Sequence, residues 1–302
     1  MTPLKITVAD HPPWLKDAAV GAGAEVVEPE SAEAVIWGLQ HNPETLRLLL
    51  DRNPRITWVQ LASAGVDEYT PLFSDGRVWT SAKGAFAGPV AEHALALVLA
   101  GLRELPQRAR ARHWGDKGGR TLADAAITII GAGGVARALV ELMAPFHPVI
   151  TVVGMPAEEI PGAHRLLDPH QLDRALQGAE VVVLAAALTA DTRGMIGREQ
   201  LRLMGPGCWL VNVARGLLVR TDDLVEALQQ GMLGGAALDV TDPEPLPDGH
   251  PLWRCQNCLI TPHTANPPQL ERKLLSLRIQ ENIRRRSQGI DLEGVIDPVL
   301  GY

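Results

Sequence analysis

The sequence predicts an α/β protein with two doubly wound domains, each built on a parallel sheet. Short β-branched runs alternate with helical segments along most of the 302 residues, which is typical of parallel sheets with helices on both faces. A glycine-rich turn at residues 131–136 divides this alternation into two series. A charged amphipathic segment, 269–286, follows the second series. If that last helix returns to the first domain, the chain crosses between the domains twice.

The first series predicts a small doubly wound domain. A helix is expected from Asn42 to Leu50, because Asn53 and Pro54 end it. Five strand-like runs surround it, at residues 4–9, 24–27, 34–37, 56–60 and 77–80. A long apolar helix then follows at residues 87–100, with Pro89 in its first turn, where a helix has no use for the missing N–H. We expect this helix to connect the two domains.

Composition and charge exclude several classes of protein. A 46% hydrophobic and 21% charged chain is globular in composition. The net charge is −7 and the longest basic run is Arg284–Arg286, which argues against nucleic acid as a partner. The longest uncharged apolar run, 94–102, is far short of the roughly 20 residues that span a bilayer. With no signal peptide at its start and three cysteines, the chain is expected to be soluble and cytoplasmic, with no membrane partner.

The turn at residues 131–136 has the pattern of a dinucleotide-binding loop. An apolar run ending at Ile130 leads into G-x-G-x-x-A and then into helix-forming residues. Gly131 would make the tight turn, and Gly133 would let the backbone approach a pyrophosphate. Ala136 stands where a third glycine often packs helix against strand. The first helical amides, those of Gly134 and Val135, would then hold the phosphates, although a plain strand-to-helix turn has the same pattern.

The cofactor is expected to be NAD or NADP, and the sequence leaves the choice open. The next strand, 149–153, should end in an acidic residue that holds the ribose hydroxyls of NAD. It ends instead in Gly154, Met155 and Pro156, with no arginine or lysine for a 2′-phosphate. Glu158 and Glu159 come a little too late. We therefore expect Gly154 to lie at the ribose and backbone groups to hold it.

The second series supplies three polar residues that core packing does not explain. Its further strands are expected at residues 180–184, 209–213, 236–240 and 258–261, with a helix at 224–230. Arg215, Glu244 and His263 each follow one of the last three strands. Because ligands collect at the carboxyl ends of parallel strands, all three residues map to one edge of one sheet. The cleft between the two domains is then the natural place for a substrate beside a cofactor.

These three residues suit the reduction of a 2-keto acid. Arg215 offers a planar fork of donors to the carboxylate and keto oxygen. His263 can donate a proton to the keto oxygen as hydride reaches the carbon, and Glu244 on its other ring nitrogen would favour the imidazolium. Each also has a structural interpretation: an arginine in a surface salt bridge, a glutamate in a solvated turn and a histidine that caps a loop.

The pair Cys255 and Cys258 forms a C-x-x-C, the spacing of some zinc and redox sites. A second cysteine or histidine pair with matching spacing is missing from the sequence. We therefore expect no metal, and interpret the pair as a coincidence of a loop and a strand.

From about residue 56 to residue 285 the sequence resembles the D-isomer-specific 2-hydroxyacid dehydrogenase family, which includes glyoxylate/hydroxypyruvate reductases and phosphoglycerate dehydrogenase. The resemblance depends on seven segments taken together. They are Ala62–Asp67 (ASAGVD), Pro89–His93 (PVAEH), Gly131–Gly133 (GAG), Asn212–Gly216 (NVARG), Gly235–Val240 (GAALDV), Pro243–Leu246 (PEPL) and Thr261–Ala265 (TPHTA).

The resemblance implies two Rossmann-like domains, with a cofactor domain at 96–267 inserted into a discontinuous substrate domain at 1–95 and 268–302. It further implies a homodimer built on the cofactor domain and a catalytic set of Arg215, Glu244 and His263. The cofactor would also lie against Val213, Ala214 and Asp239, the last at the nicotinamide carboxamide. The substrate would meet the amides of Ala64 and Gly65 and the loop that contains Lys83 and Gly84.

The function predicted is hydride transfer between NAD(P)H and a small 2-keto or D-2-hydroxy acid. Two alternatives stay open: a formate- or phosphite-type dehydrogenase of the same superfamily, although formate dehydrogenases carry Gln at the position of Glu244, and a non-catalytic NAD(H)-sensing protein. Gly65 could also simply turn the chain, and Asp239 could be a buried hydrogen-bonding partner. Trp114 could cover the cleft of a neighbouring subunit or pack on the surface, and Lys83 could lie outside the substrate site.

Overall fold

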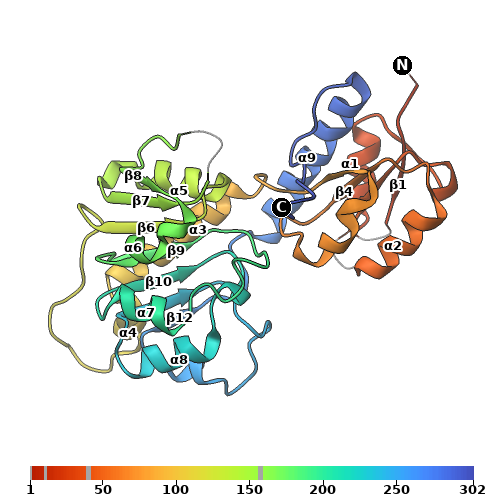
Figure 1. The fold of residues 1–302 in the computed structure, drawn as a ribbon. Helices are drawn as coiled ribbons and strands as arrows, with labels where there is room; N and C mark the ends of the chain where they lie inside the picture. The colour runs from red at the N-terminus through yellow and green to blue at the C-terminus, as the bar shows by residue number, and fades with distance from the viewer. Residues whose placement is uncertain (1, 10–11, 39–41, 156–158) are drawn as a thin grey trace. The chain divides into compact units, whose positions relative to one another are not determined.

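The computed structural model describes residues 2–9, 12–38, 42–155 and 159–302 and divides into two units (Figure 1). Unit 1 comprises Met1–Phe86 and Pro267–Tyr302, and unit 2 comprises Ala87–Asn266. Unit 2 is therefore inserted into unit 1, so the chain passes between the units twice. The predicted boundary at residue 95 falls inside the first helix of unit 2, which begins at Ala87 and belongs wholly to that unit.

Within the described residues, unit 2 is built on a sheet of seven parallel strands in the order β12-β11-β10-β9-β6-β7-β8. Counted from β6, this order is 3-2-1-4-5-6-7, the arrangement of dinucleotide-binding sheets with one further strand. The order reverses between β6 and β9, and ligands bind at such a reversal beyond the carboxyl ends of the strands. The strands are β6 Ala126–Ile130, β7 Val149–Val153, β8 Arg165–Leu167, β9 Val181–Leu184, β10 Trp209–Asn212, β11 Gly235–Leu238 and β12 Cys258–Ile260.

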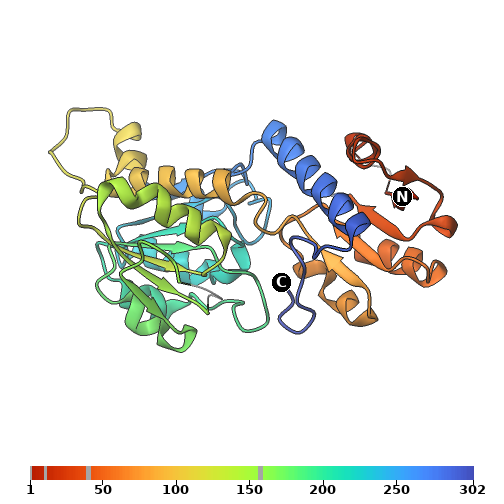
Figure 2. The ribbon, with the colours of Figure 1, turned by 90° about the horizontal axis from the view of Figure 1, so that it is seen from above.

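Both faces of this sheet are covered because alternate strand residues point to opposite sides. Ile127 and Ile129 of β6 pack with α3 and α5 on one face, whereas Ile130 belongs to a second core with α6, α7 and α8. Figure 2 shows α3 and α5 running side by side over their face. The helices are α3 Ala87–Leu102, α4 Leu105–Arg110, α5 Gly134–Met143, α6 Leu172–Leu176, α7 Arg198–Met204 and α8 Thr221–Gln229, with single 3₁₀ turns at Ala144–Phe146, Pro169–Gln171, Gly216–Leu218 and Pro251–Arg254.

Unit 1 is a smaller doubly wound domain with the strand order β2-β1-β3-β4-β5, the other common order of this architecture. Helix α9 packs against α1, and a separate core lies among α2, the 3₁₀ helix Asp67–Asp75 and the sheet. The strands are β1 Lys5–Val8, β2 Glu25–Val26, β3 Ala34–Trp37, β4 Trp58–Leu61 and β5 Val78–Thr80; the helices are α1 Trp14–Gly21, α2 Pro43–Arg52 and α9 Pro268–Gln288, with a 3₁₀ turn at Pro29–Ser31. The predicted fold class is therefore confirmed in both units.

Two differences from the predicted elements have simple causes. Strand β8 was not expected, because Arg165–Leu167 is a short, partly exposed strand at the sheet edge with no apolar alternation. The predicted strands 209–213, 236–240 and 258–261 end early, at residues 212, 238 and 260. Their last residues instead form the loops in which the polar side chains of interest lie.

The longest of the described helices, α9, carries many charged residues, and nowhere in the described part of the chain is a helix both long and apolar enough to cross a membrane.

Candidate active site

The glycine turn between β6 and α5 matches the shape that a pyrophosphate requires. Gly131 has a φ of +111°, and a Cβ built on it would lie 2.4 Å from the carbonyl oxygen of Ala185, so only glycine fits. Gly133 is the residue just before α5, and a Cβ built there would meet nothing within 4 Å. The amides of Gly134 and Val135 have no partner inside the helix, and among the described residues no side chain caps it. This helix start therefore fits a dinucleotide phosphate by its own chemistry.

The end of β7 packs closely on that turn. A Cβ on Gly154 would lie 2.8 Å from the Cβ of Ala132, so a larger residue cannot stand here without moving the glycine loop. Met155, which follows, is 73% exposed. The exposed Glu159 lies just beyond, and its carbonyl accepts a 2.8 Å hydrogen bond from Arg137 of α5. Pro156 and Glu158 lie outside the described residues.

Arg215 stands at the carboxyl end of β10, where a buried side chain fixes the loop. Asn212 is 1% exposed; its Nδ2 donates to the carbonyl of Arg215 at 2.9 Å and its Oδ1 accepts from the amide of Ala214 at 3.0 Å. The Arg215 guanidinium, half-buried, donates to the carbonyl of Ala214 at 2.9 Å. Val213 and Ala214 thus belong to a short loop that these hydrogen bonds hold together. The loop follows β10, and β9 lies between β10 and β6, the strand before the glycine turn.

A close approach of two backbones brings the loops after β10 and β11 together. A Cβ on Gly216 would lie 1.9 Å from the carbonyl oxygen of Thr241, closer than any side chain tolerates. Thr241 in turn donates to the carbonyl of Pro243 at 2.9 Å. Arg215 and Glu244 therefore lie on two loops that touch each other.

Glu244 and His263 form a direct pair. The Nδ1 of His263 lies 2.6 Å from Oε1 of Glu244, and both side chains are about half exposed. Because a carboxylate can only accept, Nδ1 is the donor and Nε2 is left for another partner. His263 has a φ of +49°, an uncommon backbone conformation for a histidine, and its amide donates to the carbonyl of Asp239 at 2.8 Å. An exposed imidazole backed by a carboxylate is the arrangement of a general acid and base.

The backbone beside this pair is held by the buried carboxylate of Asp239. It accepts hydrogen bonds from the Thr261 hydroxyl at 2.6 Å and from the amides of Thr264 and Ala265 at 2.9 and 3.0 Å. Burial by itself would raise the pKa of Asp239, but the hydrogen bonds from His93, Thr261 and the two amides outweigh it and lower the pKa to about 2. Asp239 is thus a buried hydrogen-bonding partner of the loop that contains His263; its contact with a nicotinamide stays a prediction.

His93 of α3 is a residue whose role the sequence did not reveal. Its Nε2 lies 3.0 Å from the hydroxyl of Thr261 and 3.2 Å from Oδ1 of Asp239, so it braces the same loop from the helix side. The motif Pro89–His93 contained it, but a histidine inside an apolar helix gives no sign of a partner 168 residues away.

The other predicted substrate residues lie in unit 1. Ala64 and Gly65 follow β4, and Lys83 and Gly84 follow β5, so both loops lie at the carboxyl edge of that sheet. The amide of Ala82 donates to the carbonyl of Ser63 at 2.9 Å, which joins the two loops.

Cys255 and Cys258 are both buried thiols. Burial raises the pKa of Cys255 and, with the neighbouring Cys255 thiol, raises the pKa of Cys258 to about 12. In the described ranges, His, Cys, Asp and Glu side chains nowhere gather in threes as metal ligands would. Trp114 is fully exposed, in the loop that follows α4.

Comparison with known proteins agrees with this geometry. The family model described as "D-isomer specific 2-hydroxyacid dehydrogenase, NAD binding domain" matches residues 93–265, which lie inside unit 2. An uncharacterized protein from the proB 3′ region of Corynebacterium melassecola is 35% identical over 299 residues, 96% of this chain and 97% of the relative. Glyoxylate/hydroxypyruvate reductase A of Serratia proteamaculans (strain 568) is 33% identical over 178 residues, 58% of this chain and 56% of the relative.

Solved structures resemble the whole chain. A D-isomer specific 2-hydroxyacid dehydrogenase from Xanthobacter autotrophicus Py2, crystallised in complex with NADPH and MES, is 27% identical. It superposes with a TM-score of 0.87 over 100% of both chains.

Proposed function

The chain belongs to the D-isomer-specific 2-hydroxyacid dehydrogenase family, and from this premise we propose that it transfers hydride between NAD(P)H and a small 2-keto acid to give the D-2-hydroxy acid. Membership confirms the resemblance and the NAD(P) cofactor predicted from the sequence. The observation that carries the proposal is the 2.6 Å pair of His263 and Glu244 at the same sheet edge as Arg215.

The residues of this chain account for each need of the reaction except the hydride, which bound NAD(P)H supplies. Arg215 binds the carboxylate and keto oxygen of the substrate and polarises the carbonyl with a fixed positive charge. His263 donates the proton to the keto oxygen from Nε2 and takes it back in the reverse direction. Glu244 holds the ring by Nδ1, so that Nε2 faces the substrate, and stabilises the charge that the imidazolium carries.

The remaining roles follow the same family pattern. We propose that Gly131, Gly133, Gly134, Val135, Gly154, Val213, Ala214 and Asp239 contact the cofactor, and that Ala64, Gly65, Lys83 and Gly84 contact the substrate. The Serratia relative is named for glyoxylate and hydroxypyruvate, and the Xanthobacter protein was crystallised with NADPH, which favours small substrates and leaves NADPH as the first cofactor to test. A homodimer built on unit 2 and a cytoplasmic location remain predictions.

The first test follows reduced-cofactor absorbance with glyoxylate, hydroxypyruvate, pyruvate, phenylpyruvate and longer 2-keto acids, each with NADH and NADPH. We expect oxidation with at least one small 2-keto acid. His263→Ala should lower kcat by about 1000-fold while the Kd for reduced cofactor, measured by fluorescence, stays within about twofold.

Glu244→Gln is the matched variant. It keeps the shape but loses the charge, so kcat should fall by about tenfold and the pH profile should move. Turnover of formate or phosphite alone would support the dehydrogenase alternative. Cofactor binding without turnover of any of these compounds would favour the sensing protein and contradict the proposal.

A further inference from the structure

Lys83 in unit 1 contacts an aromatic residue from outside its own loop, Tyr302. Its Nζ lies 5.0 Å from the centroid of the Tyr302 ring, the geometry of a cation–π contact. Burial lowers the pKa of Lys83, against a smaller opposite effect of Asp297. The lysine, although exposed, therefore lies beside an aromatic face.

Tyr302 is brought to Lys83 by the segment 294–302, which folds back after α9 (Figure 2). Val295 pairs with Thr80 at the edge of β5, and the amide of Ile296 donates to the carbonyl of Trp79 at 2.9 Å. A closed turn follows, in which the amide of Asp297 donates to the carbonyl of Tyr302 at 3.1 Å. The position of the ring is thus fixed by backbone pairing with the sheet.

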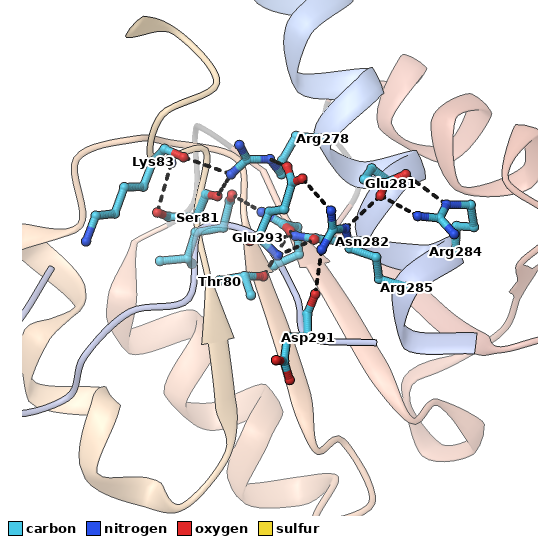
Figure 3. A network of polar contacts seen from close by, with 12 residues as sticks. Thr80, Ser81, Lys83, Arg278, Glu281, Asn282, Arg284, Arg285, Asp291 and Glu293 are labelled. Atoms are coloured by element: carbon cyan, nitrogen blue, oxygen red, sulfur yellow. Dashed lines mark hydrogen bonds and ion pairs between the residues drawn. The ribbon is translucent and has the colours of Figure 1, made fainter. Parts of the chain in front are cut away.

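The other end of the Lys83 loop is fixed by Arg278 of α9. Only 11% of this side chain is exposed, and its Nη1 donates to the carbonyls of Lys83 at 2.8 Å and Ser81 at 3.3 Å. Its Nε pairs with Glu293 at 3.2 Å. Figure 3 shows the Lys83 carbonyl facing the guanidinium while the Lys83 side chain leads away from it.

This orientation decides which groups the loop presents. In a trans peptide the carbonyl and the next N–H point in opposite directions, so the inward carbonyl of Lys83 turns the amide of Gly84 outward. The outward side of the loop then offers an amide and an ammonium, which are both donors. Donors without acceptors are what a carboxylate requires.

We propose that Tyr302 and Arg278 are positioning residues that hold the Lys83–Gly84 loop as an anion-recognising element for the substrate carboxylate. This inference rests on the proposed function, since the substrate is a 2-keto acid. Tyr302 acts through the Lys83 ammonium, and Arg278 acts through the Lys83 carbonyl.

The test is a double-mutant cycle on Lys83 and Tyr302, read as KM for the best 2-keto acid and as the calorimetric Kd for oxalate, an unreactive carboxylate probe. Tyr302→Leu should raise both constants by about three- to fivefold, whereas Tyr302→Phe, which keeps the ring face, should leave them near the wild-type values. In a Lys83→Met background, Tyr302→Leu should have no further effect. In the two Tyr302 variants, kcat and the Kd for cofactor should not change.

Three results would overturn the inference: the same effect of Tyr302→Leu with and without Lys83, no effect in either background, or no measurable oxalate binding by the wild-type protein. Failure of the proposed function gives a different signature. The wild-type protein would then reduce no 2-keto acid, while the oxalate constants still decide whether Tyr302 positions Lys83.

Discussion

The loops at the carboxyl edges of the two sheets are held by side chains of opposite charge. In unit 2 the carboxylate of Asp239 accepts hydrogen bonds from the amides of Thr264 and Ala265. In unit 1 the guanidinium of Arg278 donates to the carbonyls of Ser81 and Lys83. A buried anion therefore fixes one loop by its N–H groups, and a largely buried cation fixes the other by its C=O groups.

The difference separates the work of the two loops. In unit 2 the loop amides donate to Asp239, and the loop displays a side chain, the imidazole of His263, to the solvent. In unit 1 the loop carbonyls accept hydrogen bonds from Arg278, and the groups that the loop turns outward are the amide of Gly84 and the ammonium of Lys83. The first arrangement suits proton transfer, whose effect is on kcat, and the second suits anion binding, whose effect is on KM.

Of the three changes that test this comparison, the largest effect is expected at the backbone contact that joins two loops of unit 2. Gly216→Ala places a methyl group 1.9 Å from the carbonyl of Thr241, so one loop must move and carry Arg215 or Glu244 with it. We expect kcat/KM to fall by about 100-fold, the scale of a 1 Å misplacement. Gly88→Ala in α3, where a Cβ meets nothing within 4 Å, is the control and should keep wild-type kinetics. Unchanged kcat/KM in a folded Gly216→Ala protein would show that the loops move independently.

The next effect tests the buried anion. Asp239→Asn puts an NH₂ where amide donors converge, so kcat should fall by about tenfold. The pKa of Asp239 lies below its ordinary value of 3.8, at about 2, so its stabilisation, ~2 kcal/mol, is complete above about pH 4 and is lost as the pH falls towards 2. When the pH is lowered from 6 to 3, the free energy of unfolding in urea should therefore fall less for Asp239→Asn than for the wild type. Glu199→Gln, at an exposed ion pair, should behave like the wild type.

The sequence predicted every strand of the two sheets except β8, because β-branched runs and turns are local signals. It also predicted where Arg215, Glu244 and His263 stand, because the carboxyl ends of parallel strands share one edge. Gly131 could be interpreted in the same way, since only glycine takes its φ.

The polar anchors could not be predicted, because each joins parts of the chain that are far apart. Arg278 reaches the Lys83 carbonyl across 195 residues, and within its own helix it is one of many charged side chains. His93 similarly reaches Thr261 from a helix that is mostly apolar. Periodicity indicates which face of an element is buried, but it does not indicate which distant polar group that face contacts.

Of the three changes, the smallest effect is expected at the largely buried cation, Arg278. Arg278→Lys keeps the positive charge, but a single ammonium cannot reproduce the fork that reaches Glu293 and two carbonyls together. We expect KM for the 2-keto acid to rise by about fivefold, the worth of roughly one hydrogen bond, while kcat and the cofactor Kd stay unchanged.

Arg284→Lys is the matched control for this change. Arg284 lies on the same helix, is 47% exposed and pairs with Glu281, away from the Lys83 loop, so its replacement should leave KM as it is. A fall in kcat with unchanged KM in Arg278→Lys would contradict the separation of roles, because a cation that fixes only the anion-binding loop has no route to the proton-transfer step. Equal rises of KM in both variants would instead attribute the effect to helix α9 as a whole. The guanidinium of Arg278 would then have no specific role in holding the Lys83–Gly84 loop.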